Sequence, residues 1–212
     1  MVLATGVVLD TYQIFSKSPI NSLSDIEGGK VAGAGMNLRY LEGINGAAGV
    51  RGGLTDFYNM LNTGLVDHAM LWPEAANRFK IAEVAPFMLQ ADIGAVNSKT
   101  VTVNADYWAS LPAEVQDTLK EVAVLYRDHI ANEAMNRAGK SRDGYVKSGG
   151  TIVEMDAAER AAWIAAIPDL AVDWANGLDA KGEPGTEMLN AYLAKLAAAG
   201  YTPIRDWAEG LN

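Results

Sequence analysis

The 212-residue sequence contains no cysteine and only two histidines. The absence of cysteine excludes disulfides, thiolate catalysis and cysteine-ligated zinc. The histidines show no HExxH spacing, so a zinc site would need carboxylate ligands that the sequence does not bring together. We interpret His68 as a buried or edge position in a strand and His129 as a solvated helix residue. We therefore expect no metal site and no cofactor.

The sequence also lacks an excess of basic residues and any long apolar run. Its net charge is −9, which argues against nucleic-acid binding because that function needs a basic surface. No run of eighteen apolar residues is present, so no membrane-spanning helix is expected. The residues after Met1 lack the basic segment of a signal peptide.

Signatures of common enzymes are missing as well. The glycine-rich turn at Gly33 and Gly35 has neither the GKS nor the GxGxxG arrangement of a phosphate loop, and no serine sits in a GxSxG elbow. Glu42 and Glu74 would suit the acid and base of a glycosidase, but nothing in the sequence places them together. We expect no catalytic residues, and a hydrolase is the least favoured function.

The most informative stretch is Leu54–Phe87, which has the pattern helix, tight turn, buried strand, helix, strand. Thr55 is suited to cap the first helix, and Gly64 to end it in a left-handed conformation. Ala69–Trp72 is apolar throughout, as in a strand that is covered on both faces. Pro73 suits the first position of the next helix.

This pattern predicts a binding site at the end of that strand. In an open α/β sheet, ligands bind outside the carboxyl ends of the strands, which places Leu71, Trp72 and Glu74 at the site. Trp72 would give a pocket an apolar wall, although it would equally suit core packing. Glu74 would contact a hydroxyl or an amine, or would only complement the helix dipole. Tyr58 is a further candidate.

The remaining pattern predicts alternating strands and helices, which is typical of an α/β protein. The predicted elements are a strand over Val7–Phe15, a strand over Val31–Ala34, a helix capped by Asn37 that ends near Gly46, a loop and strand over Asp92–Asn104, a helix from Pro112 to Lys147, a strand over Thr151–Met155, a helix with a capping box at Asp156 and Glu159 that is interrupted at Pro168, and a helix over Thr186–Ala199.

Apolar spacing within these helices predicts which side chains are buried. On the longest helix the apolar stripe consists of Val115, Leu119, Val122, Tyr126, Ile130 and Ala134. On the last helix the expected buried residues are Met188, Leu189, Tyr192, Leu193 and Leu196. The aromatic residues expected in the core are Phe79, Phe87, Trp163 and Trp174.

Three segments carry a resemblance to a known family: Ser18–Gly35, Phe57–Phe87 and Val103–Ala123. In this order and spacing they resemble the solute-binding proteins of TRAP transporters, the dicarboxylate-type (DctP) extracytoplasmic family. The resemblance implies an α/β, periplasmic-binding-protein-like fold, with two lobes, crossing strands and long C-terminal helices. It assigns 1–98 and 141–212 to the second lobe and 99–140 to the first. It also implies that the N-terminal third of the family's length is lacking.

The resemblance implies a function in transport. Such proteins capture a small organic acid between the lobes by hinge closure and deliver it to the membrane permease subunits, in the periplasm. Many relatives hold the ligand carboxylate with an arginine, but the matching residue here is Ala32. Arg39 or Arg51 would replace it, unless both are solvated. A ligand contact near Asn97 is also implied, although a turn-forming asparagine would look the same.

A second hypothesis remains beside this one. If the missing third is not supplied, the chain would keep its fold without binding ligand. Its unpaired strand edge would then favour a homo-oligomer formed by exchange of a strand or helix between copies.

Overall fold

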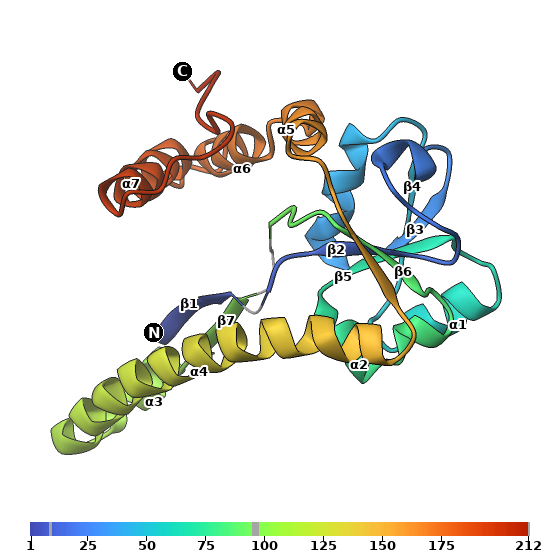
Figure 1. Cartoon of the computed structure of the whole chain (residues 1–212). Coiled ribbons are helices and arrows are strands. Elements are labelled where there is room, and N and C mark those ends of the chain that lie inside the picture. The colour runs from blue at the N-terminus through green and yellow to red at the C-terminus, as the bar shows by residue number, and fades with distance from the viewer. Residues whose placement is uncertain (9, 95–97, 212) are drawn as a thin grey trace.

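The structure, a computed structural model, describes residues 1–8, 10–94 and 98–211 (Figure 1). Its strands form a sheet of six and a sheet of two. The larger sheet has the order β4-β3-β5-β2-β6-β8. Its strands are β2 (Gln13–Ser16), β3 (Lys30–Gly33), β4 (Ala48–Arg51), β5 (His68–Leu71), β6 (Phe87–Gln90) and β8 (Thr151–Glu154). The smaller sheet pairs β1 (Val2–Val8) with β7 (Ser98–Thr102), antiparallel.

The larger sheet is mixed in direction at its centre. β2 is antiparallel to both neighbours, so that Ile14 lies opposite Met70 of β5 and Leu89 of β6. The pairs β3–β4, β3–β5 and β6–β8 are parallel. All four residues of β5 are buried, which confirms the prediction of a strand covered on both faces.

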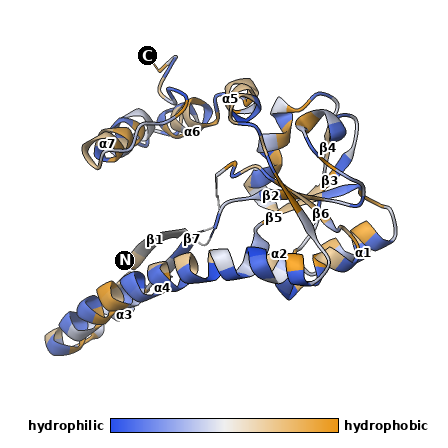
Figure 2. Cartoon of the chain, viewed as in Figure 1, coloured by the Kyte–Doolittle hydropathy of each residue, from blue (hydrophilic) through white to orange (hydrophobic). Residues whose placement is uncertain are grey.

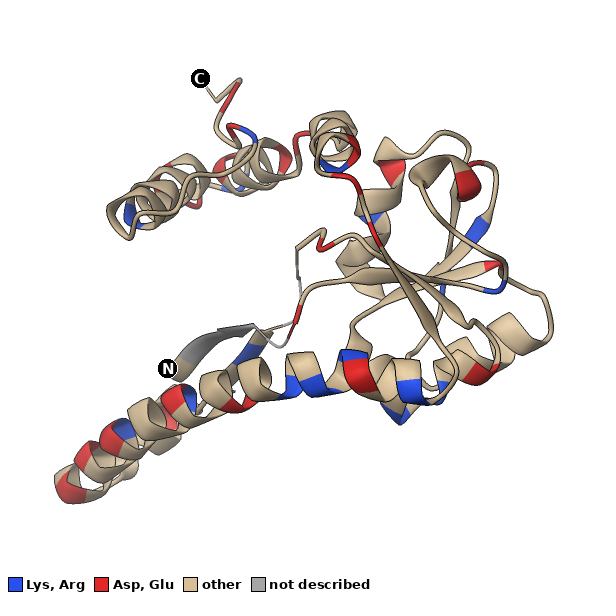
Figure 3. Cartoon of the chain, viewed as in Figure 1, with Lys and Arg blue, Asp and Glu red and all other residues tan. Residues whose placement is uncertain are grey.

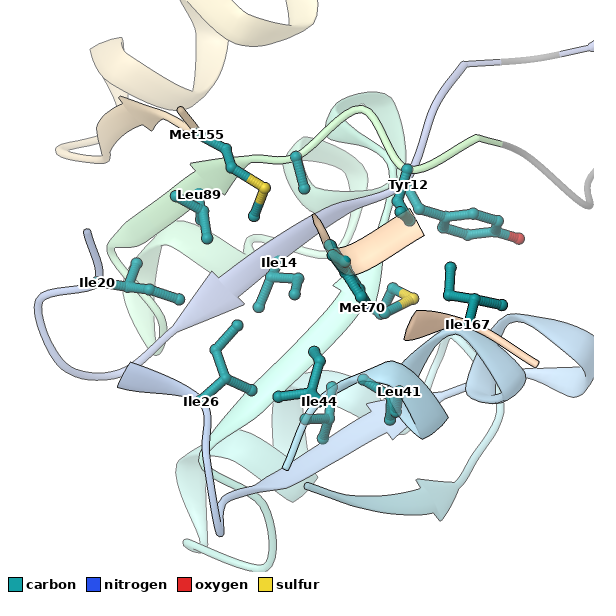
Figure 4. Close-up of a cluster of buried hydrophobic side chains, with 14 of the residues drawn as sticks. Tyr12, Ile14, Ile20, Ile26, Leu41, Ile44, Met70, Leu89, Met155 and Ile167 are labelled. Atoms are coloured by element: carbon teal, nitrogen blue, oxygen red, sulfur yellow. The ribbon is translucent and has the colours of Figure 1, made fainter. Parts of the chain in front are cut away.

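Helices cover both faces of the larger sheet. The helical segments are η1 (Leu23–Asp25), η2 (Gly35–Gly43), α1 (Phe57–Asn62), α2 (Pro73–Arg78), η3 (Ile81–Glu83), α3 (Ala105–Ser110), α4 (Ala113–Lys147), α5 (Ala157–Ala166), α6 (Leu170–Asp179) and α7 (Gly185–Ala198). Ile14 belongs to the cluster under η2 and α5 (Figure 4), whereas Phe15 belongs to the cluster under α1, α2 and the end of α4. This alternation is the period of two expected of a strand.

The single strand predicted over Val7–Phe15 is wrong, because the chain changes sheets within it. β1 belongs to the smaller sheet and β2 to the larger. Between them, Asp10 Oδ1 accepts a hydrogen bond from the backbone N of Thr11 (2.8 Å), and Thr11 Oγ1 donates to Asp92 (2.6 Å). Side-chain bonds of this kind compete with a strand ladder.

Helix α4 joins the two sheets, and its predicted bounds are confirmed to within one residue. At its C-terminal end, buried Tyr145 donates to the carbonyl O of Ala85 (2.6 Å) and meets the ring of Phe15 edge-on. Its N-terminal half lies beside β1 (Figure 1). Within the described ranges, no helix has an apolar stretch long enough to cross a membrane.

The apolar stripe on the N-terminal half of α4 is exposed, not packed into a core. The exposed fractions are 40% for Val115, 36% for Leu119, 51% for Val122 and 39% for Tyr126, while Ala123 is buried. Figure 2 shows apolar and polar residues alternating along this helix. β1 of the two-stranded sheet contacts α4, but this contact leaves Val115, Leu119, Val122 and Tyr126 exposed.

The C-terminal helices begin as predicted but bury less than expected. Asp156 caps α5 by accepting bonds from the backbone N atoms of Ala158 (2.8 Å) and Glu159 (3.2 Å). The predicted capping box is wrong, because Glu159 Oε1 instead accepts a bond from the backbone N of Leu23 (2.8 Å). Pro168 separates α5 from α6.

Helices α6 and α7 extend away from the sheets (Figure 1). Trp163 of α5 is in the core, as predicted, but Trp174 of α6 is 47% exposed. On α7, Leu189 is buried, whereas Met188 and Tyr192 are 50% and 60% exposed. These helices pack mainly on each other. The predicted burial is therefore wrong at Trp174, Met188 and Tyr192, while Leu193 and Leu196 are partly buried.

Two predicted helix caps are also wrong. The residue before α1 is Asp56, not Thr55. The segment expected to begin at Asn37 is a 3₁₀ helix that begins after Ala34, so that Asn37 lies inside its first turn. Both patterns located the helix, but a helix boundary predicted from sequence is uncertain by one or two residues, and neither observed cap residue makes a side-chain capping bond.

A polar cluster connects the places where the chain passes between the sheets. Arg142 of α4 lies 3.5 Å from Asp10 Oδ2 and 3.5 Å from Asp92 Oδ1. Asp92 also accepts bonds from Thr11 Oγ1 (2.6 Å) and Gln13 Nε2 (2.8 Å). Burial raises the pKa of Asp92, but these hydrogen bonds and the Arg142 charge outweigh it, so the pKa lies below its ordinary value.

Candidate functional site

Two neighbouring cavities share the side chains of Leu54 and Trp72. The first, which we call the strand-end cavity, has a volume of about 320 Å³ and is lined by Tyr12, Ala34, Gly35, Met36, Asn37, Leu54 and Trp72. The second, the interhelix cavity, has a volume of about 410 Å³. It is lined by Leu54, Trp72, Glu74, Ala75, Arg78, Phe79, Lys99, His129, Ile130, Glu133, Ala134 and Arg137.

The strand-end cavity forms where β3 and β5 end side by side. After β3 the chain turns at Gly35, whose φ of +68° favours glycine. Asn37 fixes this turn: its Oδ1 accepts a bond from the Ala34 backbone N (2.9 Å), and its Nδ2 donates to the Met70 carbonyl O (3.2 Å). The buried side-chain amide of Asn37 thereby connects the ends of β3 and β5. It fixes the backbone of Ala34, which lines the cavity.

Trp72 lines both cavities. It follows β5 directly and precedes Pro73, the first residue of α2. Its ring meets Tyr12 edge-on, with centroids 6.1 Å apart. Its Nε1 is buried and donates to no acceptor in the described part of the chain. An unpaired buried donor costs about 1–3 kcal/mol, so an acceptor on a ligand would be favoured here.

The interhelix cavity is lined by charged residues of three elements, α2, α4 and β7. Figure 3 shows basic and acidic positions along the ribbon of α4. Arg137 of α4 lies 3.4 Å from Glu74 of α2 and 3.3 Å from Glu133, with half-exposed side chains. Arg78 of α2 and Lys99 of β7 form no ion pair within the described ranges. Cations therefore outnumber carboxylates in this cavity, although the chain as a whole is acidic.

The structure brings some of the predicted site residues together. Trp72 and Glu74 line the interhelix cavity, and fully buried Leu71 packs behind Trp72 in the sheet. Arg39 pairs with Glu42 (2.5 Å) and Asp173 (3.6 Å), away from both cavities.

Other predicted site residues lie elsewhere. The hydroxyl of Tyr58 donates to Glu83 Oε2 (3.0 Å), a bond that raises the pKa of Tyr58. Ala32 is fully buried in β3, and Arg51 ends β4 at the edge of the sheet. Asn97 lies outside the described residues.

Sequence reasoning did not select Tyr12, Asn37 or Arg137 for the site. Tyr12 looked like a strand residue and Asn37 like a helix cap. Arg137 lies on a helix with many charges, where spacing alone does not show which residue faces α2. The glycines around Ala34 were a usable signal, because they mark a strand end that a ligand could approach.

An open, mixed sheet with helices on both faces, with cavities at the carboxyl ends of its strands, is the architecture of an α/β binding protein of the periplasmic type. Comparison with family models identifies the group: residues 2–176 match the bacterial extracellular solute-binding proteins, family 7 (DctP). The chain belongs to this family, whose members are extracytoplasmic. The α/β, periplasmic-binding-protein-like fold predicted from the sequence is thereby confirmed.

Solved structures agree on the fold. A TRAP periplasmic solute-binding protein from Desulfovibrio salexigens, with bound orotic acid, matches with a TM-score of 0.79 and 20% identity, over 92% of this chain and 63% of that one. The ectoine-binding protein TeaA of a TRAP transporter, in its apo state, matches with a TM-score of 0.76 and 18% identity, over 92% and 64%. A TRAP periplasmic solute-binding protein from Pseudomonas aeruginosa, with bound L-malate, matches with a TM-score of 0.69 and 18% identity, over 78% of this chain and 58% of that one.

The chain thus spans less than two thirds of the length of these structures. A comparison with curated proteins finds no match. The family and its structural neighbours are transport proteins and not enzymes.

Proposed function

We propose that this chain is the extracytoplasmic solute-binding component of a TRAP-type transporter and captures a small organic acid at the two cavities around Trp72. The observation that carries the proposal is the position of Trp72 between both cavities, with a buried Nε1 that has no acceptor in the described chain. Structural neighbours with bound orotic acid and L-malate support the ligand class. The chain would act without catalysis.

The site residues take different roles in this proposal. Trp72 faces the ligand, Glu74 lines the interhelix cavity beside it, and Leu71 holds Trp72 from behind in the core. Tyr12 and Asn37 complete the strand-end cavity. Arg39 and Tyr58 are held by their acidic partners and support the surrounding fold. Contact by Asn97 stays a prediction.

The transport mechanism follows from the two sheets. Residues 1–98 and 141–212 would form most of one lobe and 99–140 part of the other, except that β1 (Val2–Val8) pairs with β7 of the smaller sheet and would move with that second group. Closing of the segments around Asp92 would then enclose the ligand. The closed form would dock on the permease subunits, which supply the ion coupling. This function places the protein in the periplasm.

The test is tryptophan fluorescence during titration with orotate, L-malate and D-galacturonate. A saturable change in the wild type that is lost in Trp72→Phe supports the proposal. The matched control is Trp174→Phe, which removes an exposed tryptophan outside both cavities and should leave the change intact. No response up to about 10 mM, the weak end of specific binding, would contradict the proposal.

A second candidate function is association without ligand binding. The exposed stripe on α4 and the two-stranded sheet beside it favour this alternative. Failure to bind any acid, together with a stable oligomer, would support it.

A further inference from the structure

We propose that the acid group of the ligand is held in the interhelix cavity by Arg137, with Lys99 and Arg78 beside it, while the body of the ligand lies against Trp72. This inference rests on the proposed function and deepens it, because it assigns the carboxylate anchor. The ligand class is an organic acid with an uncharged body that fits the strand-end cavity.

The strand-end cavity is a poor place for the acid group. Its lining residues include no charged side chain. The position where the family resemblance implies an arginine is Ala32, which is fully buried and contributes a methyl group to the core. A carboxylate without a cation in such a place would be costly. Tyr12, Trp72 and the Asn37 turn instead suit the uncharged part of a ligand.

The interhelix cavity offers what the first cavity lacks. Three cations, Arg78, Lys99 and Arg137, line it together with two carboxylates. A guanidinium binds a carboxylate through two parallel hydrogen bonds, which fixes both position and orientation. Leu54 and Trp72 line both cavities, so the cavities adjoin and one ligand would contact both.

The present partners of Arg137 are replaceable. Its contacts to Glu74 (3.4 Å) and Glu133 (3.3 Å) are longer than the 2.7–2.9 Å typical of charge-assisted bonds. The three side chains are 40–59% exposed, and exposed ion pairs contribute little to stability. A ligand carboxylate would therefore displace Glu74 from Arg137 at small cost.

This arrangement also connects the ligand to both sheets. Lys99 lies on β7 of the smaller sheet, Arg78 on α2 against the larger one, and Arg137 on the helix that joins them. An acid group among the three would draw β7 towards α2. Closure would then depend on the charge of the ligand and not only on its shape.

The test is calorimetric titration of the full chain with acids and with their uncharged counterparts. Orotate is compared with uracil, and D-galacturonate with D-galactose. Arg137→Gln should weaken binding of the acids about threefold or more, the effect of losing one partly exposed ion pair. Arg127→Gln removes an equal charge from α4 outside both cavities, and it should change affinity by less than about twofold.

A second variant moves affinity in the opposite direction. Glu74→Gln removes the competing carboxylate, so acids should bind about threefold more tightly or better. A merely structural role of the Glu74–Arg137 pair would not produce this gain. Circular dichroism of each variant checks that the fold is intact.

The outcomes separate the two proposals. Binding of acids by the wild type that is unchanged in Arg137→Gln, or equal binding of uracil and orotate, would overturn the assigned anchor and leave the proposed function standing. Failure of the wild type to bind any acid up to about 10 mM would overturn both.

Discussion

At the scale of single residues, the shape of the strand-end cavity depends on a side chain that fixes the backbone at the ends of two strands. Asn37 is 1% exposed and connects the ends of β3 and β5 through two hydrogen bonds. The sequence identified it as polar and near a helix start, but the partner at Met70 is 33 positions away and no local pattern reveals it. Trp72 was selected as a candidate because its signal is local: an apolar strand, then proline.

Asn37→Ala should lower the free energy of unfolding by about 1–3 kcal/mol, because two backbone groups at the cavity wall lose their partner. Urea denaturation measures the change. The control Asn59→Ala removes an exposed asparagine of α1 and should change the free energy by less than about 0.5 kcal/mol. Equal changes in the free energy of unfolding for the two substitutions would show that the hydrogen bonds of the buried Asn37 amide do not stabilise the fold.

At the scale of elements, local patterns predicted most helices and strands but not their partners. β5, α4 and the Asp156 cap follow from short-range rules and are as expected. The division of the first predicted strand into β1 and β2 did not follow, because β-branched residues favour a strand without saying to which sheet it belongs. The point at which the chain leaves one sheet for the other depends instead on hydrogen bonds from Thr11 and Gln13 to Asp92. Asp92 lies 81 and 79 positions further along the chain.

The cluster around Asp92 should make stability depend on acid pH. Because the pKa of Asp92 is lower in the folded chain than its unfolded value of about 3.9, the unfolded chain binds the proton first as pH falls. The stabilisation is therefore present above about pH 4 and is lost as pH falls through the folded pKa.

Asp92→Asn tests this dependence while preserving the backbone. The φ of Asp92 is +46°, a left-handed conformation that asparagine also tolerates. The variant should be less stable than wild type at pH 7, and the difference should shrink towards pH 3. Asp106→Asn, at an exposed position of α3, is the control. A difference that stays constant with pH would refute the role of the charge.

At the scale of the whole molecule, the chain combines a well-packed six-stranded sheet with a helix that is half covered. Apolar periodicity correctly predicted that α4 has an apolar face, but periodicity does not tell whether anything packs on it. That face is the largest difference between the predicted and the observed core. An exposed apolar stripe of this kind is typical of a surface that binds a partner, which is the basis of the second candidate function.

Association through this face should be concentration-dependent and sensitive to charge. Val122→Asp places a carboxylate in the stripe, where Val122 is 51% exposed, and should shift the chain towards monomer in light scattering coupled to size exclusion. Met135→Asp is the matched control, because Met135 is 71% exposed on another side of α4. A wild type that is monomeric at all concentrations would remove the basis for association.

The most direct test of the central claim is the indole N–H resonance of Trp72 in a nitrogen–proton correlation spectrum, recorded during titration with orotate. Trp72→Phe assigns the resonance. Trp163 is an internal reference, because its Nε1 already donates to the carbonyl O of Tyr40 (2.9 Å). A ligand at the two cavities should shift the Trp72 resonance saturably and leave that of Trp163 in place. Saturable binding without a shift of Trp72 would contradict the account, since the ligand would then bind elsewhere.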